Sequence, residues 1–303
     1  MNDDQNIHDN PLVELRFALA EGDAIDAPAD LRARVLAAAA DARRPGRAVD
    51  TPEWISGAEA FRRAVERLDA LLGELAPDEW GRAALRDLDV QGLVGHLIGV
   101  EESFIAVLGG ANDIDDHVVA TQPAALRQRE QSPVATHREW FDSATAAIAA
   151  IETVGEKTPV SFYGVTLPLD DLLIIRAFEM WIHDEDIRRA TDRPLASPDP
   201  ERLARMVGLA TMLLPAGIAR AGHATAGSTA RLVLTGVGGG TWNVNLDGSP
   251  DERSADSRIV VDAAEFCRVV GNRENQAGSG ALVSGSADIA AGVFIGAAAL
   301  ALD

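Results

Sequence analysis

The stretch that decides the fold reads Leu172-Leu-Ile-Ile-Arg-Ala-Phe-Glu-Met-Trp-Ile-His-Asp-Glu-Asp-Ile187. Its apolar residues recur at helical spacing, which predicts a helix with one stripe facing the core. Glu179 and His183 stand four residues apart on that stripe, so we expect their Cβ atoms about 5–6 Å apart. A carboxylate that faces the core must be paired, hydrogen-bonded or bound to a metal. The spacing therefore predicts a pair of divalent-metal ligands or, alternatively, a buried hydrogen bond that Glu179 accepts from His183 or Arg176.

A second helical stripe offers a further ligand. The segment Leu88-Asp-Val-Gln-Gly-Leu-Val-Gly-His-Leu97 places His96 among apolar residues at helical spacing, and Asp89 can cap the start of that helix. A core histidine on its own fits a structural role as well as a ligand. Metal sites in helix bundles are generally assembled from separate helices, and a catalytic zinc usually has three protein ligands. The candidate ligands are therefore His96, Glu179 and His183.

Together the two motifs resemble those of the mycothiol-dependent maleylpyruvate isomerase family, within the wider DinB-like superfamily. The His96 segment is similar to the family's second helix. Phe162-Tyr-Gly-Val-Thr-Leu-Pro-Leu-Asp-Asp-Leu172, which runs into the Glu179 segment, is similar to the fourth helix and the loop before it. The resemblance covers roughly residues 51–300. It implies that His96, Glu179 and His183 bind one divalent metal, typically zinc, and that mycothiol is a small thiol cofactor.

The same resemblance and the hydrophobic pattern predict an α+β fold in three parts. Residues 1–50 are expected to be an N-terminal extension and linker, with docking to a protein partner as the alternative. Residues 51–195 are expected to form a DinB-like four-helix bundle, whose third helix, from about 121 to 151, breaks near Pro133. Residues 158–166 are expected to form an extended loop. Residues 196–303 are expected to form a small α+β domain similar to sterol carrier proteins.

Two further residues are candidates for catalysis. Asp186 follows His183 at helical spacing and could orient its imidazole, although an acidic, solvated helix end is the alternative. The resemblance implies that an arginine of the C-terminal domain contributes, and Arg273 is our choice among four that the sequence does not distinguish: Arg231, Arg258, Arg268 and Arg273.

Composition limits the partners and the compartment. The chain has 47 acidic against 27 basic residues, a formal charge of −20, which disfavours nucleic acid or an anionic membrane as a partner. Cys267 is the only cysteine and is expected to be a packed core residue, so no intrachain disulfide can form. The sequence shows no secretory signal pattern, and its longest apolar run, residues 289–302, is short for a bilayer. We therefore expect a cytoplasmic protein.

The expected chemistry follows from a metal with an open position. A metal held by two imidazoles and one carboxylate lowers the pKa of a bound thiol or water. With mycothiol as the thiol, the leading expectation is isomerisation or thiol transfer on a small electrophilic substrate, bound between the bundle and the C-terminal domain. Two alternatives remain open: a metal-dependent hydrolase, and a non-enzymatic protein that binds an apolar ligand. The sequence does not identify the substrate.

Overall fold

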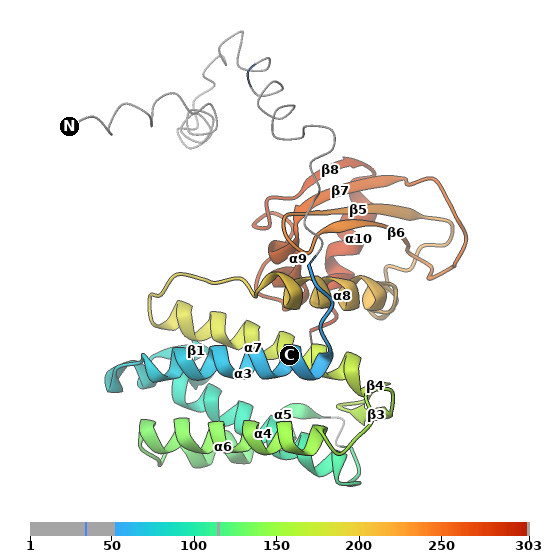
Figure 1. The fold of residues 1–303 in the computed structure, drawn as a ribbon. Coiled ribbons are helices and arrows are strands. Elements are labelled where there is room, and N and C mark those ends of the chain that lie inside the picture. The colour runs from blue at the N-terminus through green and yellow to red at the C-terminus, as the bar shows by residue number, and fades with distance from the viewer. Residues whose placement is uncertain (1–33, 35–51, 114–115, 302–303) are drawn as a thin grey trace, which may run out of the picture. The chain divides into compact units, whose positions relative to one another are not determined.

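The N-terminal half of the fold is built from long helices (Figure 1). The computed structural model describes residue 34 and residues 52–113 and 116–301, so the expectations for residues 1–50 lie outside it except at Arg34. Helix α3 packs on α7 and α4 packs on α6, while α3 also contacts α6 and α4 contacts α7. These pairings make a four-helix bundle, whose members are α3 (Gly57–Gly73), α4 (Val90–Leu108), α6 (Pro133–Ile151) and α7 (Leu169–Ala190).

Helix starts follow the capping residues of the sequence. The Asp89 side chain accepts a hydrogen bond from Gly92 N at 2.7 Å and begins α4, as expected. The connection from α3 to α4 carries a short 3₁₀ helix and two short paired strands: η1 (Pro77–Gly81), β1 (Ala83–Leu85) and β2 (Leu88–Asp89).

Two expectations for the bundle need correction. The third helix is not one broken helix: α5 (His117–Gln128) and α6 are separate, because Ser132 caps α6 and Pro133 occupies its first position. Helix α5 packs on α4 as a fifth helix. Residues 158–166 do not form an extended loop; β3 (Pro159–Phe162) and β4 (Val165–Pro168) pair as a hairpin. Its turn residues Tyr163 and Gly164 both have positive φ, 50° and 74°, as a tight two-residue hairpin turn requires.

The C-terminal part combines three helices with a four-stranded sheet. The strand order is β6-β5-β7-β8, with β5 and β7 parallel and the other pairs antiparallel. All three helices contact strands of this sheet, and α8 also contacts α7 of the bundle. The elements are α8 (Pro200–Arg220), β5 (Thr229–Thr235), β6 (Gly240–Asn245), β7 (Ser257–Asp262), α9 (Ala263–Val270), β8 (Leu282–Gly285) and α10 (Ala287–Ala298). The α+β fold class is therefore confirmed, while the domain boundary near residue 195 stays a prediction.

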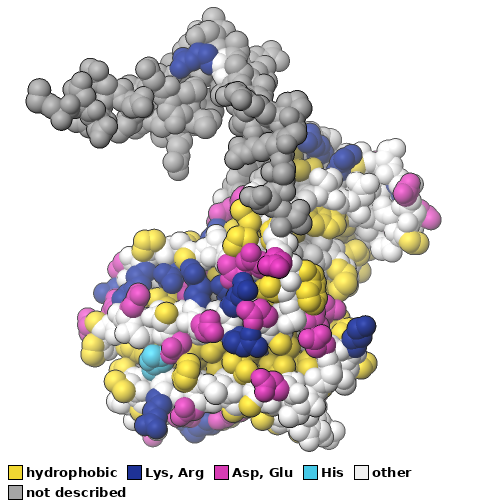
Figure 2. All heavy atoms as spheres, in the orientation of Figure 1, with side chains coloured by type: hydrophobic (Ala, Val, Ile, Leu, Met, Phe, Trp, Pro, Cys, Tyr) yellow, Lys and Arg dark blue, Asp and Glu magenta, His cyan; other side chains and the backbone are white. Residues whose placement is uncertain are grey.

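The helices α4 and α8 are long and apolar enough to cross a membrane by length and composition alone. More than half of each apolar window is buried inside the fold, so both serve as core helices here. The surface carries charges of both signs: on the face shown in Figure 2, acidic and basic side chains of the described residues are interspersed. Several are exposed ion pairs, such as Arg127 with Glu102 at 2.7 Å.

Candidate metal centre

The three candidate ligands converge on one point between α4 and α7. His96, Glu179 and His183 each present a ligand atom within 4.8 Å of the other two. His96 Nε2 lies 3.5 Å from Glu179 Oε1, and the rings of His96 and His183 have centroids 5.4 Å apart. The i, i+4 spacing on α7 supplies two of these groups, and the packing of α4 supplies the third.

The hydrogen bonds of His96 fix which ring nitrogen is free. Its Nδ1 lies 2.9 Å from Thr121 Oγ1, and the Thr121 hydroxyl donates its only hydrogen to His117 O at 2.8 Å. Thr121 must therefore accept from His96 Nδ1–H, which leaves a lone pair on Nε2, the nitrogen that faces Glu179. Burial also lowers the pKa of His96, which favours the neutral ring.

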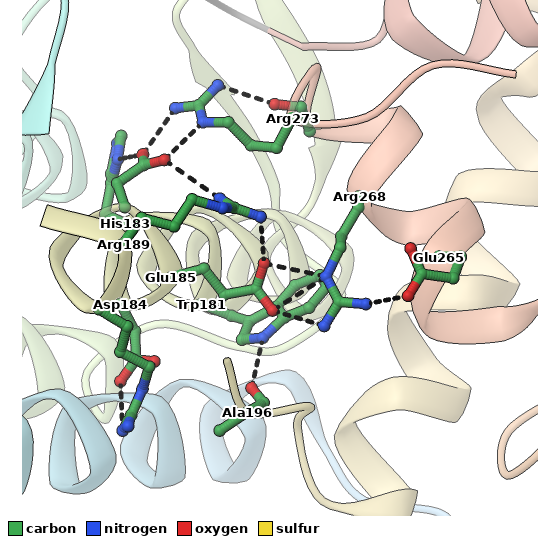
Figure 3. Close-up of polar contacts among 12 residues, drawn as sticks. Trp181, His183, Asp184, Glu185, Arg189, Ala196, Glu265, Arg268 and Arg273 are labelled. Carbon is green, nitrogen blue, oxygen red and sulfur yellow. Dashed lines mark hydrogen bonds and ion pairs between the residues drawn. The ribbon is translucent and has the colours of Figure 1, made fainter. Parts of the chain in front are cut away.

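His183 is oriented in the same way by a carboxylate. Its Nδ1 lies 3.1 Å from Asp186 Oδ2, and an ionised carboxylate can only accept, so Nδ1 carries the hydrogen and Nε2 is free. Arg273 donates to both oxygens of Asp186 at 2.8 Å (Figure 3). Burial opposes the charge of Asp186, but these hydrogen bonds outweigh it, so the pKa of Asp186 is lowered.

Glu179 is held by an arginine that the sequence offered as its alternative partner. Arg176 donates to Glu179 Oε2 and also, at 2.6 Å, to Glu101 Oε1 on α4. Burial works against the charge of Glu179, but the Arg176 guanidinium outweighs it and keeps the pKa of Glu179 well below the usual range. Burial raises the pKa of Glu101. The Glu179–Arg176 hydrogen bond thus coexists with the triad, because the other carboxylate oxygen, Oε1, faces His96.

Glu101 and Thr121 are site residues that sequence reasoning missed. Glu101 carried the same signal as Glu179, a carboxylate within an apolar helix, and it is fully buried. Thr121 gave no comparable signal, since its role depends on the packing of α5 against α4. His117 also lies beside the site, with its ring 6.0 Å from that of His96.

The structure separates the four candidate arginines. Arg273 contacts Asp186, because Asn272 adopts a left-handed conformation (φ 54°) that ends α9 just before it. Arg268 instead lies between Glu185 and Glu265, with Nη2 2.7 Å from Glu185 Oε1 (Figure 3). Arg231 and Arg258 are exposed neighbours on β5 and β7.

Two cavities meet at the candidate ligands. One of about 300 Å³ is lined by Glu179 and His183 together with residues of α7, α8 and the β3–β4 hairpin. The other, of about 370 Å³, is lined by His96, His117 and His183. His183 therefore faces both cavities, and the first lies between the bundle and the C-terminal part.

Part of the chain matches a known protein family. Residues 61–188 match the model of the mycothiol maleylpyruvate isomerase N-terminal domain. This stretch of the chain is therefore a domain of that family. The matched range contains His96, Glu179 and His183. The description of the matched domain names an isomerase, which places the protein among enzymes.

Solved structures agree at the level of the fold. The chain is similar to the crystal structure of the mycothiol-dependent maleylpyruvate isomerase, with a TM-score of 0.53 and 16% identity over 75% of this chain and 91% of that one. A histidine-to-alanine variant of that isomerase gives a TM-score of 0.55 with the same identity and coverage. At this identity the likeness shows a shared fold. A comparison with curated protein sequences finds no match.

Proposed function

We propose that this family member is a metal-dependent enzyme that uses mycothiol to isomerise, or transfer a thiol to, a small electrophilic substrate. One observation carries the proposal: the free Nε2 atoms of His96 and His183 and the Oε1 atom of Glu179 converge beside a cavity. Two imidazoles and one carboxylate are a donor set that suits zinc. The family's own description supports mycothiol as the thiol.

The proposed ligands are His96, Glu179 and His183, and a metal bound there would supply positive charge that keeps a thiol ionised at neutral pH. The remaining residues act by positioning. Thr121 and Asp186 hold the two imidazoles in the tautomer whose Nε2 is free, while Arg176 holds the Glu179 carboxylate. We further propose a cytoplasmic enzyme, since a small-thiol cofactor suits a reducing compartment.

The nucleophilic sulfur must come from outside the chain. Cys267 is the only cysteine, and it is fully buried in α9. Burial raises the pKa of the Cys267 thiol, so it stays protonated and unreactive at neutral pH. We therefore expect Cys267→Ala to keep its turnover, and omission of the small thiol to abolish it.

The first test is the metal content of the purified full-length protein, measured by mass spectrometry. We expect about one divalent ion per chain, and less than about a tenth of that in His183→Ala. His137→Ala is the matched control, because His137 lies on α6 and bonds Asp69 at 2.7 Å, outside the site. Unchanged metal content in His96→Ala, Glu179→Ala and His183→Ala alike would refute the triad.

The second test is the dependence of turnover on added mycothiol. Turnover that needs both metal and thiol supports the proposal. Turnover with metal but without thiol would instead favour a metal-dependent hydrolase. Absence of turnover, combined with apolar ligand binding that survives metal removal, would favour a binding protein.

A further inference from the structure

The second cavity, on the His96 side of the candidate centre, is lined by basic side chains. Its volume of about 370 Å³ lies within the range of roughly 300–1,000 Å³ that is typical of ligand pockets. Arg86 and Arg129 line it together with the imidazoles of His96 and His183. Asp87 is the only acid among the lining residues that the structure describes, and it is exposed. A divalent metal on the candidate ligands would add positive charge at the same cavity, so the cavity favours an anion.

The two guanidinium groups of this cavity have no carboxylate partner. Arg129 Nη2 donates to the backbone oxygen of Asp87 at 3.0 Å, at the β1–β2 turn that also carries Arg86. No ion pair joins either arginine to a carboxylate in the part of the chain that the structure describes. Most other arginines of the bundle are paired, as Arg82 is with Asp192 at 3.0 Å. Both guanidinium groups are therefore available to a negatively charged ligand.

The backbone of Arg86 also points to a role for its side chain. Its φ of 50° lies in the left-handed region, which glycine and asparagine adopt more readily than arginine does. Such a conformation costs free energy, and residues held in it cluster at active and ligand-binding sites. An arginine at this turn is therefore unfavourable for folding, while its side chain lines the cavity.

We propose that Arg86 and Arg129 bind a carboxylate of the substrate in the second cavity, next to His96 and His183. A guanidinium group suits a carboxylate because it can donate two parallel hydrogen bonds to it. The proposal rests on the proposed function for the reaction, but the anion site follows from the cavity alone. Arg86 and Arg129 are then the residues that determine specificity for an electrophile that carries a negative charge.

The first test measures the binding of maleate to metal-free, full-length protein by isothermal titration calorimetry. We expect Arg86→Asn and Arg129→Gln each to weaken binding by about tenfold or more, because each removes charge-assisted hydrogen bonds. Arg86→Asn should keep or raise the melting temperature, since asparagine tolerates the left-handed conformation. Arg258→Gln is the matched control, because Arg258 is an exposed arginine of β7 that lines neither cavity.

Arg129→Lys keeps the positive charge and should bind maleate more tightly than Arg129→Gln does, whereas a purely structural role would affect both variants alike. Unchanged maleate affinity in Arg86→Asn and Arg129→Gln would overturn the proposal. So would an equal loss in Arg258→Gln, or the absence of measurable maleate binding to the wild-type protein.

The second test compares kcat/KM for a carboxyl-bearing enone with that for its neutral methyl ester, with metal and mycothiol present. The ratio of the two values should fall by about tenfold or more in Arg86→Asn and Arg129→Gln. Thiol-dependent turnover with an unchanged ratio would overturn this inference and leave the proposed function standing. Failure of all thiol-dependent turnover in the wild-type protein would refute the proposed function, while calorimetry on the metal-free protein would still decide the anion site.

Discussion

At the residue scale, the orientation of each candidate ligand is set by a hydrogen bond on the side of the residue that faces away from the centre. Each candidate ligand uses one atom for a fixed partner, namely Thr121, Asp186 or Arg176, and presents the other. Sequence spacing could suggest Asp186, because it follows His183 by three residues on one helix. It could not suggest Thr121, because the contact of Thr121 with His96 depends on how closely α5 packs against α4. The sequence of either helix does not show that distance.

We predict that Asp186→Asn weakens metal binding by roughly 10–100-fold, as losses of such supporting groups typically do. The amide can still accept from His183, but it removes the charge that Arg273 and His183 share. Titration of the metal-free protein with zinc against a competing chelator measures the change.

The control for this prediction is Asp184→Asn. Asp184 is also buried on α7 and paired, but both of its carboxylate oxygens bond Arg188, with Oδ1 2.6 Å from Nε, and not His183. Both variants should lose some stability, and only Asp186→Asn should lose metal affinity. Equal zinc affinities in the two variants would mean that Asp186 does not support the site.

At the scale of elements, two glycines allow α4 and α5 to touch. A Cβ atom on Gly95 would lie 2.8 Å from Ala125 Cα, and one on Gly99 would lie 2.8 Å from Thr121 Cα. The second contact is the one that brings Thr121 to His96. Backbone approach of this kind explains why α5 was not anticipated as a separate helix beside the site.

We predict that Gly99→Ala pushes α5 away from α4, because the new methyl group would meet backbone. The Thr121 hydroxyl then leaves His96, so zinc affinity should fall by about tenfold and the melting temperature should drop. Gly208→Ala is the control: it lies in α8 with nothing within 4 Å of its Cβ position, and should gain about 0.5–1 kcal/mol of stability. Wild-type zinc affinity in Gly99→Ala would contradict this account.

The strands show where local patterns succeed and where they fail. Strands β5 and β7 alternate buried and exposed side chains along the two faces of the sheet, a pattern that the sequence itself carries. The β3–β4 hairpin was missed because Pro159 and Pro168 at its ends argue against strands. Its decisive signal was Tyr163-Gly164, and an aromatic residue with positive φ is uncommon.

At the scale of the whole molecule, the sequence predicted the fold class and a family resemblance. The α+β fold is confirmed, and the match of residues 61–188 to the family's N-terminal domain confirms the resemblance. The pair of motifs sufficed because each places a titratable side chain on an apolar helix. The cavity could not be predicted, since it depends on how far apart α7 and α8 stand. The pattern of apolar residues within one helix does not determine its distance from another helix.

The free energy of unfolding should depend on pH through Glu79. Arg193, beyond the end of α7, donates to both carboxylate oxygens of Glu79 at 2.6 and 2.9 Å. That hydrogen bonding lowers the pKa of Glu79 to about 2 from 4.5. Because the pKa of Glu79 is lower in the folded state, its ionised carboxylate stabilises the fold at any pH above its pKa in the unfolded chain. This stabilisation is lost as the pH falls from about 4.5 to about 2.

We therefore predict that Glu79→Gln lowers the denaturant midpoint at pH 7 and that its deficit shrinks as the pH falls toward 2. Denaturation of both proteins across this range measures the effect. Glu252→Gln is the control, since Glu252 is an exposed glutamate away from Arg193 in the sequence. A deficit that stays constant with pH would show that packing, and not charge, accounts for the loss.

Consecutive residues of α7, Glu185 and Asp186, are each held by an arginine from the region of α9, Arg268 and Arg273. A recombinant chain that joins this bundle to the C-terminal part of another family member would leave both carboxylates with Arg189 of α7 as their arginine partner, unless Arg268 and Arg273 came with it. Without Arg273, Asp186 would also lose a contact that holds it against His183. The bundle and the C-terminal part must therefore be inherited together. A substitution on one side of these two ion pairs selects for a matching change on the other.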